Sequence, residues 1–293
     1  MILSMTGFGE AQLEQDDHAY HLDIRSVNNR YFKSSIRLPE DFAFMETRLE
    51  QMIRERLTRG SVALRLHMRD LSASAAQDMN LAAIQQYTAQ LQSAAAAEGT
   101  FTIDLATLAM LPGVCQPHEL TEPQRERAEA LIMQLTETAV EKLAGMRRTE
   151  GMALAEDLQT YCVNIREQVQ AIRSRVPAVL ESYRDRLTAR VQELLTGSNV
   201  HLATEDLLKE VAIYAERSDV SEELSRLRSH LEQFEKVMAG AESAGRKLDF
   251  IAQEMLREAN TIGSKAGDAE IARRVIEIKS AIDRIKEQVQ NVV

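Results

Sequence analysis

The chain has 293 residues and a formal net charge of −10, with a sequence pI near 5.3. This acidic balance excludes a nucleic-acid binder that relies on bulk positive charge, although it leaves room for local basic clusters. The sequence has no tryptophan and only 4% aromatic residues, so its core must be built from Leu, Ile, Val, Ala and Met. With 12 glycines and 5 prolines, the composition predicts long helices and few turns.

The sequence carries no sign of secretion or of membrane insertion. No apolar run is long enough to span a bilayer, and the first residues lack the basic and apolar regions of a signal peptide. The two cysteines, Cys115 and Cys162, fit no disulfide or zinc framework and are predicted to be small buried hydrophobic residues. Together these features predict a cytoplasmic protein that makes no membrane contact.

Residues 1–70 are expected to form a small unit of strands with one helix. Alternating apolar residues predict a strand from His18 and another from Tyr31. A helix should follow up to Leu57, because its apolar residues recur at helical spacing. After a turn at Gly60 the alternation returns. Strand, strand, helix, strand is the order of an α+β unit.

The rest of the chain is predicted to be mainly helical. Residues 71–79 are expected to be a loop, a long helix or a pair of helices to cover 124–176, and another helix to cover 177–195. The predicted fold class is α+β and predominantly α, with a small N-terminal strand and helix unit followed by long helices. The predicted domains are an N-terminal α+β domain with a helical extension (1–155), linking helices (156–204) and a heptad-like C-terminal helical domain (205–293).

Two heptad-like apolar seams mark the C-terminal domain. Their members follow one another at spacings of three and four residues: Val220, Leu224, Leu227, Leu231, Phe234 and Met238, then Ile271, Val275, Ile278, Ile282, Ile285, Val289 and Val292. Such seams pack helix against helix. They are interpreted either as core packing within one chain, which is the commoner case, or as contacts between subunits.

A polar stripe accompanies the first seam, displaced from it by one residue. Its members share one helical face: Glu216, Asp219, Glu223, Arg226 and His230. Three of them are acids in succession, which repel one another unless positive charge lies among them. A divalent cation or a facing arginine would supply that charge.

A second pair of like charges lies further along the C-terminal domain. Glu254 and Glu258 are four residues apart and therefore share one helical face. Both sets of acids permit two interpretations, a network of ion pairs between helices or a metal site, and spacing alone slightly favours the ion pairs. No HExxH, EF-hand, Walker or GxGxxG motif is present to decide between them.

Basic residues are interleaved with amides and aromatics near the N-terminus. The segment DIRSVNNRYFKSSIRLPE places four basic residues around two amides and two aromatic rings: Arg25, Arg30, Lys33 and Arg37 with Asn28, Asn29, Tyr31 and Phe32. This mixture suits single-stranded RNA, through phosphate contacts and stacking, and Arg59 in LTRGSV adds to it. A tight turn at Asn28–Asn29 with ordinary surface arginines is an equally good interpretation.

Several strings at both ends of the chain are distinctive. They are SMTGFG from Ser4, IRSVNNRYF from Ile24, RLPE from Arg37, LTRGSV from Leu57, ERSDVSEELSRLRSHLEQF from Glu216, GRKLDFIAQEMLREANTIGSKAGDAEI from Gly245 and EIKSAIDRIKEQVQNV from Glu277. In these strings the sequence resembles the YicC-like family, also called YicC/YloC. The resemblance implies a metal-dependent endoribonuclease that forms a ring-like homohexamer around its RNA.

The resemblance and the acidic stripes together lead to a hypothesis of metal-assisted cleavage of RNA phosphodiester bonds. Mg²⁺ or Mn²⁺ is the expected cofactor, with these ligands: Glu216, Asp219, Glu223, Glu254 and Glu258. The expected catalytic residues are Glu223, Glu254, Glu258 and His230, the last as general acid or base. RNA contacts are expected from Arg25, Asn28, Arg30, Tyr31, Arg59, Arg226, Arg246, Lys247, Arg257 and Lys265.

Two other classes of function stay open at this point. The protein could be a non-catalytic RNA-binding adaptor that delivers transcripts to another ribonuclease, with structural acidic stripes. It could also be a helical scaffold that binds no RNA. A ring would reconcile RNA binding with the acidic charge, because arginines from several subunits would converge inside it.

Overall fold

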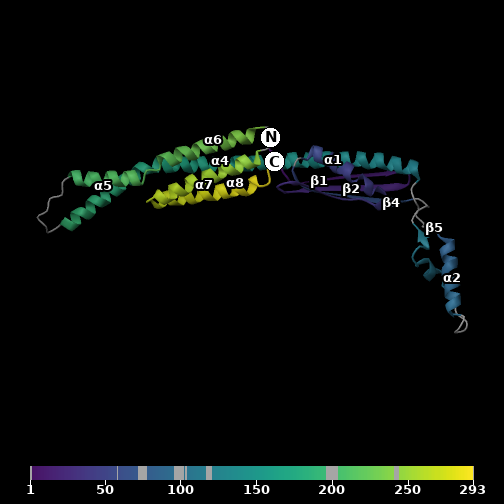
Figure 1. The fold of residues 1–293 in the computed structure, drawn as a ribbon. Coiled ribbons are helices and arrows are strands. Elements are labelled where there is room, and N and C mark those ends of the chain that lie inside the picture. The colour runs from purple at the N-terminus through teal and green to yellow at the C-terminus, as the bar shows by residue number, and fades with distance from the viewer. Residues whose placement is uncertain are drawn as a thin grey trace. The chain divides into compact units, whose positions relative to one another are not determined.

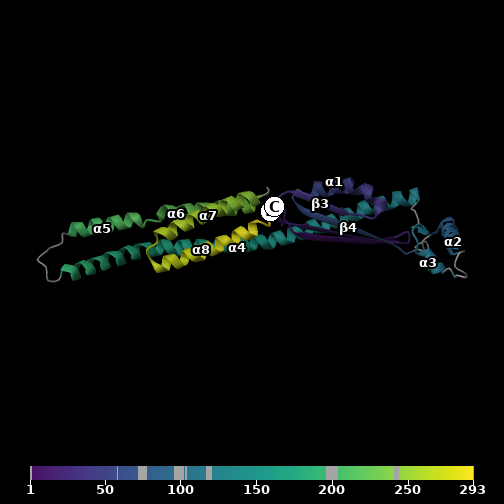
Figure 2. The same cartoon turned by 60° about the horizontal axis from the view of Figure 1, so that its bottom comes forward.

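The computed structural model of the chain describes residues 2–57, 59–71, 78–95, 102, 104–116, 121–195, 204–240 and 244–292. The chain divides into two compact units, whose elements are labelled in Figure 1 and Figure 2. The sheet unit comprises Phe8–Ser26 and Tyr31–Leu143. The helical unit comprises Met1–Gly7, Val27–Arg30 and Ala144–Val293.

The order of elements confirms the predicted class, α+β and predominantly α. The described strands are β1 (Gly7–Gln15), β2 (His18–Val27), β3 (Phe32–Arg37), β4 (Gly60–Asp70), β5 (Asp78–Met79) and β6 (Cys115–Gln116). The described helices are the 3-10 helix η1 (Glu40–Met45) and the α-helices α1 (Glu46–Arg56), α2 (Leu81–Ala95), α3 (Leu105–Ala109), α4 (Glu122–Leu195), α5 (Thr204–Arg217), α6 (Ser221–Ala239), α7 (Gly245–Lys265) and α8 (Ala269–Val289). No described helix has both the length and the apolarity of a membrane-spanning segment.

The sheet unit is built on a four-stranded sheet in the order β1-β2-β4-β3. Strands β3 and β4 are parallel, in a register that runs from the pair Phe32 and Gly60 to the pair Arg37 and Arg65. Parallel neighbours need a crossover, and η1 and α1 supply it. Strands β1 and β2 form a hairpin whose two turn residues, Asp16 and Asp17, both have positive φ angles.

One face of this sheet carries the core of the sheet unit. Strand residues such as Leu22 and Leu64 pack with Leu49 of α1 and Ile132 of α4 in a single buried cluster. Strand β1 was not predicted, because its core-facing residues are mostly small. Gly9 shows why they are small, since a Cβ atom there would lie 2.0 Å from the backbone oxygen of Ala139. Glycine allows β1 to approach α4.

The helical unit buries both apolar seams in one core. The seam residues of α6 and α8 join buried residues of α4 and α7 in that cluster, with only Met238 partly exposed. Core packing within one chain is therefore confirmed. The other interpretation, in which these seams make contacts between subunits, was wrong, because four helices of one chain already cover them.

Helix α4 differs from the predicted pair of helices. It runs without a break from Glu122 to Leu195 and contains Pro177, where a new helix was expected to start. Val176 and Val179, on either side of the proline, pack against the helical core. This packing maintains the helix despite the hydrogen bond that proline removes. Of the loop predicted over 71–79, residues 72–77 lie outside the described residues, and the prediction was wrong for Asp78–Met79, which form strand β5. Residues 196–203, which follow the last predicted linking helix, also lie outside the described residues.

The two cysteines have different environments. Cys162 is fully buried as predicted, and burial raises the pKa of its thiol to about 12. Cys115, in β6, is partly exposed, so the prediction of burial was wrong for it. A two-stranded ribbon of β5 and β6 carries it, away from the large clusters.

Candidate active site

The facing sides of α6 and α7 bring the predicted acids and cations together in the helical unit. Buried Leu227 of α6 and Met255 of α7 belong to the shared core, and polar residues displaced from this seam flank it. Glu223 and Glu258 are the only buried carboxylates among the residues that the structure describes. Since buried carboxylates are rare unless they are paired, this cluster needs an explanation.

Glu223 is paired with a cation from the other helix. The Nζ atom of Lys265 donates to Glu223 Oε1 at 2.7 Å and to the backbone oxygen of Asp219 at 3.0 Å. Burial raises the pKa of Glu223, but the hydrogen bond from Lys265 and further interactions outweigh it, so the net pKa lies below its usual value. The hydrogen bond to Glu223 also raises the pKa of Lys265. Both groups are therefore charged at neutral pH.

One oxygen of Glu223 remains available. Its Oε2 atom is buried and accepts no hydrogen bond. A buried acceptor without a donor is unfavourable, which marks this atom as a place for a proton or a ligand donor.

Glu258 faces an arginine that reaches solvent. Arg226 Nη1 lies 3.9 Å from Glu258 Oε1, and Arg226 also forms an ion pair with Glu222 on its own helix. The Arg226 side chain is 58% exposed while that of Glu258 is 8% exposed. The guanidinium thus connects a buried acid with the surface, where a phosphate could reach it.

The continuous polar stripe predicted from the sequence was wrong in its first part. Glu216 lies on α5, which ends at Arg217, and α6 begins only at Ser221. Asp219 lies in the link, where its carboxylate accepts a hydrogen bond from the backbone of Ser221 at 2.9 Å. Hydrogen bonds from Ser221, first that of its side chain, lower the pKa of Asp219. The break between α5 and α6 therefore interrupts the expected periodicity.

The remaining predicted residues of this region lie around the cluster. Glu254 lies 3.9 Å from Arg257, three residues further along α7. His230 is partly exposed on α6, two turns after Glu223, and Arg246 and Lys247 are exposed in the first turn of α7. The structure therefore forms two ion pairs between α6 and α7, Glu223 with Lys265 and Arg226 with Glu258, and leaves the other predicted residues around them.

The predicted metal ligands do not gather around one point in the described part of the chain. Within the described residues, no three His, Cys, Asp or Glu side chains come together closely enough to hold a metal ion. Lys265 and Arg226 occupy the positions beside Glu223 and Glu258 that a cation would take. Ion pairs between helices, the alternative interpretation of the stripes, are what the structure contains. The metal requirement stays a prediction.

The predicted RNA-binding residues near the N-terminus are divided between the units. Asn28 belongs to the helical unit, where its Nδ2 donates to the backbone oxygen of Gln290 at 2.7 Å. This contact joins the Asn28–Asn29 segment to the C-terminal end of the chain. Arg30 belongs to the same unit, whereas Arg25, Tyr31 and Arg59 belong to the sheet unit.

In the sheet unit, Arg25 lies over an aromatic ring. Its guanidinium carbon is 5.2 Å from the centroid of the Phe8 ring, and its Nε is 3.8 Å from Asp23. The Tyr31 ring is 61% exposed, as stacking on a base would require. The structure leaves the role of these residues a prediction.

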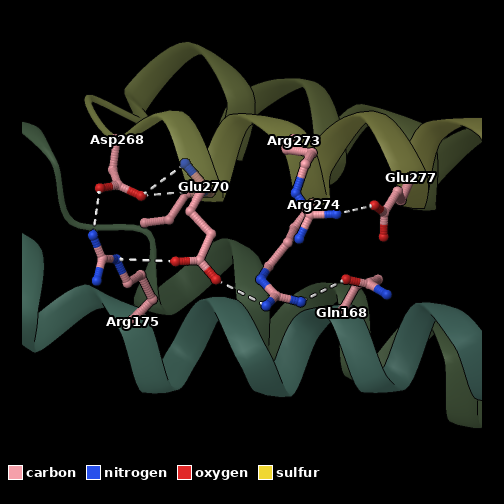
Figure 3. A network of polar contacts seen from close by, with 8 residues as sticks. Gln168, Arg175, Asp268, Glu270, Arg273, Arg274 and Glu277 are labelled. Atoms are coloured by element: carbon pink, nitrogen blue, oxygen red, sulfur yellow. Dashed lines mark hydrogen bonds and ion pairs between the residues drawn. The ribbon is translucent and has the colours of Figure 1, made fainter.

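Sequence reasoning missed a network between α4 and α8, shown in Figure 3. Arg175 lies 3.1 Å from Asp268 and 3.5 Å from Glu270, and Arg274 lies 2.9 Å from Glu270. Asp268 also accepts the first backbone N–H groups of α8, from Glu270 and Ile271. The hydrogen bond from Arg175 is the first cause that lowers the pKa of Asp268. An Asp directly before an apolar helical pattern was the available signal for this cap.

Known protein families match almost all of this chain. The model for "Endoribonuclease YicC-like, N-terminal region" matches residues 2–156, and the model for "Endoribonuclease YicC-like, C-terminal" matches residues 172–293. The chain belongs to the YicC-like family. The C-terminal model includes the whole of α5 to α8, and with them the α6–α7 cluster.

Two relatives extend the match over the full length of both proteins. A "Probable endoribonuclease YicC" of Clostridioides difficile is 33% identical over 300 residues, covering 100% of both chains. A protein of the same name from Haemophilus influenzae is 33% identical over 296 residues, covering 99% of both chains. The predicted YicC-like membership is thus confirmed.

Proposed function

We propose that this protein is an endoribonuclease that cleaves phosphodiester bonds within RNA. The observation that carries the proposal is the match of both YicC-like family models, which together cover nearly the whole chain. The names of the two full-length relatives agree with it. The acidic net charge does not oppose it, because the candidate site presents cations locally.

The α6–α7 cluster, defined as Glu223, Arg226, Glu258 and Lys265, is the proposed place of cleavage. Breaking a phosphodiester bond requires a base for the attacking hydroxyl, an acid for the leaving oxygen and positive charge near the phosphate. The Glu223 carboxylate is ionised, and its buried Oε2 atom accepts no hydrogen bond, so Glu223 is the proposed base if the attacking hydroxyl enters beside that atom. Arg226 and Lys265 supply the positive charge. Glu258 positions Arg226, and His230 is the proposed proton donor.

The proposal also includes a requirement for a divalent metal ion. The proton transfers described above are assigned to side chains and not to the metal. The described residues of one chain include no three closely placed ligands, so a cation bound among them would need oxygen atoms from the RNA phosphate or from a second copy. Glu216, Asp219 and Glu254 are the remaining acids that were predicted to contribute. A cytoplasmic location also stays a prediction.

The proposal also includes a ring of identical subunits, which would contact one another through surfaces other than the buried seams. Large apolar side chains remain exposed on the helical unit: Leu208 at 57%, Ile213 at 45%, Phe250 at 62% and Ile276 at 67%. Exposed apolar groups of this size support self-association. Light scattering of the purified protein measures the mass of the assembly directly, and a monomeric mass contradicts the ring.

The test of the nuclease is an assay of cleavage and binding on one labelled RNA stem-loop with single-stranded ends. Glu223→Gln keeps the shape of the side chain and removes its charge. We expect its cleavage rate to fall about 100-fold or more, as for loss of a general base, with RNA affinity little changed. The matched control is Glu277→Gln, which alters an exposed ion pair with Arg273 on α8. That variant should cleave at the wild-type rate.

Four results separate the alternatives. Loss of cleavage in EDTA with recovery in Mg²⁺ or Mn²⁺ supports the metal dependence, whereas cleavage that persists in EDTA contradicts it and leaves the nuclease standing. Binding without cleavage under every metal contradicts the nuclease and indicates an adaptor. Absence of both indicates a scaffold. Melting curves of each variant confirm that the protein remains folded.

A further inference from the structure

The sheet unit has one face that no helix of that unit covers. Along β4 the buried residues Val62, Leu64 and Leu66 face the core, and the residues between them are exposed. The same alternation holds along β3, where Phe32 and Ile36 pack against the core. Since successive side chains of a strand point to opposite faces, the exposed residues of both strands lie on the opposite, open face.

Basic residues dominate this open face on β3 and β4. We define the basic face as Lys33, Arg37, Arg65, His67 and Arg69, all of which are exposed. Arg37 and Arg65 are partners in the parallel register, so their side chains stand side by side. The two strands contain a single acid, Asp70, whose place in the alternation assigns it to the other face.

The cations of the basic face lack carboxylate partners. The side chains of Lys33, Arg37, Arg65 and Arg69 form no ion pair or hydrogen bond in the described part of the chain. Like charges placed opposite each other on a sheet destabilise it. In a chain of net charge −10, it is a local exception that β3 and β4 carry cations and no acid on this face. The nearest acids of the described sheet lie on the other strands, Asp23 on β2 and Glu14 on β1. An external anion would relieve the repulsion.

Two open hollows lie along the same residues. One, of about 550 Å³, is lined by Arg37, Arg65 and His67. The other, of about 680 Å³, is lined by His21, His67 and Arg69, and at its β1 side also by the acid Glu14. Because His67 belongs to both, the hollows adjoin and form one track rather than an isolated pocket. Alternate residues of a strand are about 7 Å apart, a spacing comparable to that of successive phosphates in an extended strand.

We propose that the basic face binds a single strand of RNA through its phosphates, and this inference rests on the proposed nuclease function. Arginine guanidinium groups suit phosphate because they donate two parallel hydrogen bonds. The rings of His21 and His67 offer flat surfaces for unstacked bases. Contacts of this kind are independent of sequence and position RNA rather than cleave it.

The test compares two double variants of the full-length protein. Arg37→Ala/Arg65→Ala removes two cations from the basic face. The control, Arg56→Ala/Arg127→Ala, removes two exposed cations of the same unit that have carboxylate partners, Glu137 and Asp16. The net charge changes equally in both. Binding of a short fluorescein-labelled oligouridine is followed by anisotropy at several KCl concentrations.

The first variant should bind oligouridine at least about tenfold more weakly than wild type, and the control should bind normally. Its plot of log affinity against log salt should be less steep by about 1.4, since each phosphate contact on a single strand contributes roughly 0.7. In the cleavage assay its KM should rise while kcat is retained. That split separates positioning from catalysis.

Contrary results are distinct from failure of the nuclease proposal. If both double variants bind oligouridine equally weakly, or if both bind it as tightly as wild type, the basic face is not an RNA site, even if wild type cleaves RNA. If the wild-type protein binds polyglutamate more tightly than oligouridine, the basic face is a site for an acidic protein, and the inference is overturned. The inference is also overturned if Arg37→Ala/Arg65→Ala changes the mass of the assembly and leaves the RNA affinity unchanged. Wild type that binds no RNA overturns both proposals.

Discussion

The α4–α8 network and the basic face use the same residue type in opposite ways. In the network, Arg175 and Arg274 each lie within 3.1 Å of a carboxylate, and Glu270 contacts both of them (Figure 3). On the basic face, Arg37 and Arg65 stand side by side, and neither forms an ion pair with a described carboxylate. The chain is acidic overall, so a shortage of acids does not explain the difference.

The comparison teaches that ion pairing separates two kinds of charged residue. Paired arginines stabilise the fold, and unpaired arginines can bind an external ligand. An arginine held by two carboxylates has its charge neutralised and helps to hold two helices together. An arginine beside another arginine stores repulsion that only a ligand or a new acid removes. The α6–α7 cluster lies between these extremes, because Arg226 is paired yet mostly exposed. Three changes test this distinction, in order of decreasing effect.

Asp268→Ala should give the largest loss of stability. The substitution removes the N-cap of α8 and the closest partner of Arg175 together. Loss of such a cap costs about 1–2 kcal/mol in the free energy of unfolding. Urea denaturation measures it. RNA affinity should not change, and a variant of wild-type stability would contradict a structural role for the network.

Asp268→Asn should give a smaller loss that depends on pH. Asparagine caps a helix as well as aspartate does, so only the charge facing Arg175 is lost. The folded pKa of Asp268 is lowered, so its charge contributes stability fully above the unfolded pKa of about 3.9, and this contribution disappears as pH falls through the folded pKa. Urea denaturation of both proteins from neutral to acidic pH should show their difference shrinking. A difference constant with pH would contradict the pairing.

Ser35→Glu should give the smallest change in stability, with the opposite sign. Ser35 lies on the open face between Lys33 and Arg37 and is opposite Ala63 in the register. A carboxylate there should relieve repulsion and raise the free energy of unfolding by about 0.5 kcal/mol. It should also weaken oligouridine binding. Ser35→Gln is the uncharged control, and equal behaviour of the two variants would show that the cations do not repel.

Local sequence patterns predicted most helices and strands correctly, but they did not predict the features that depend on contacts between distant residues. The alternation from His18 and the helical spacing up to Leu57 match β2 and α1. Strand β1 was not predicted, because the residues that it turns toward the core include Gly9 and Ala11, which are small. Their small size is explained only by the close packing of α4 against them. Pro177 suggested a boundary that packing on both sides removed. In each failure a tertiary contact overrode a local preference.

The candidate site shows the same limit. Sequence spacing located Glu223, Arg226, Glu258 and Lys265 on two neighbouring helices and offered ion pairs as one interpretation. It did not identify Lys265 as the partner of Glu223, because that pairing depends on the rotation and register of α6 against α7. Nor did it connect Lys33 and Arg37 with Arg65 and Arg69, which become neighbours only when β3 pairs with β4.

The sequence by itself determined the YicC-like family, the α+β class, the apolar seams and the residues able to carry charge chemistry. These follow from composition and from periods of two and 3.6 residues, which are local properties of a chain. Only the tertiary structure decided which charges neutralise one another and which face solvent unpaired. Coulomb interaction depends on the distance between groups far apart in sequence, and only packing sets that distance.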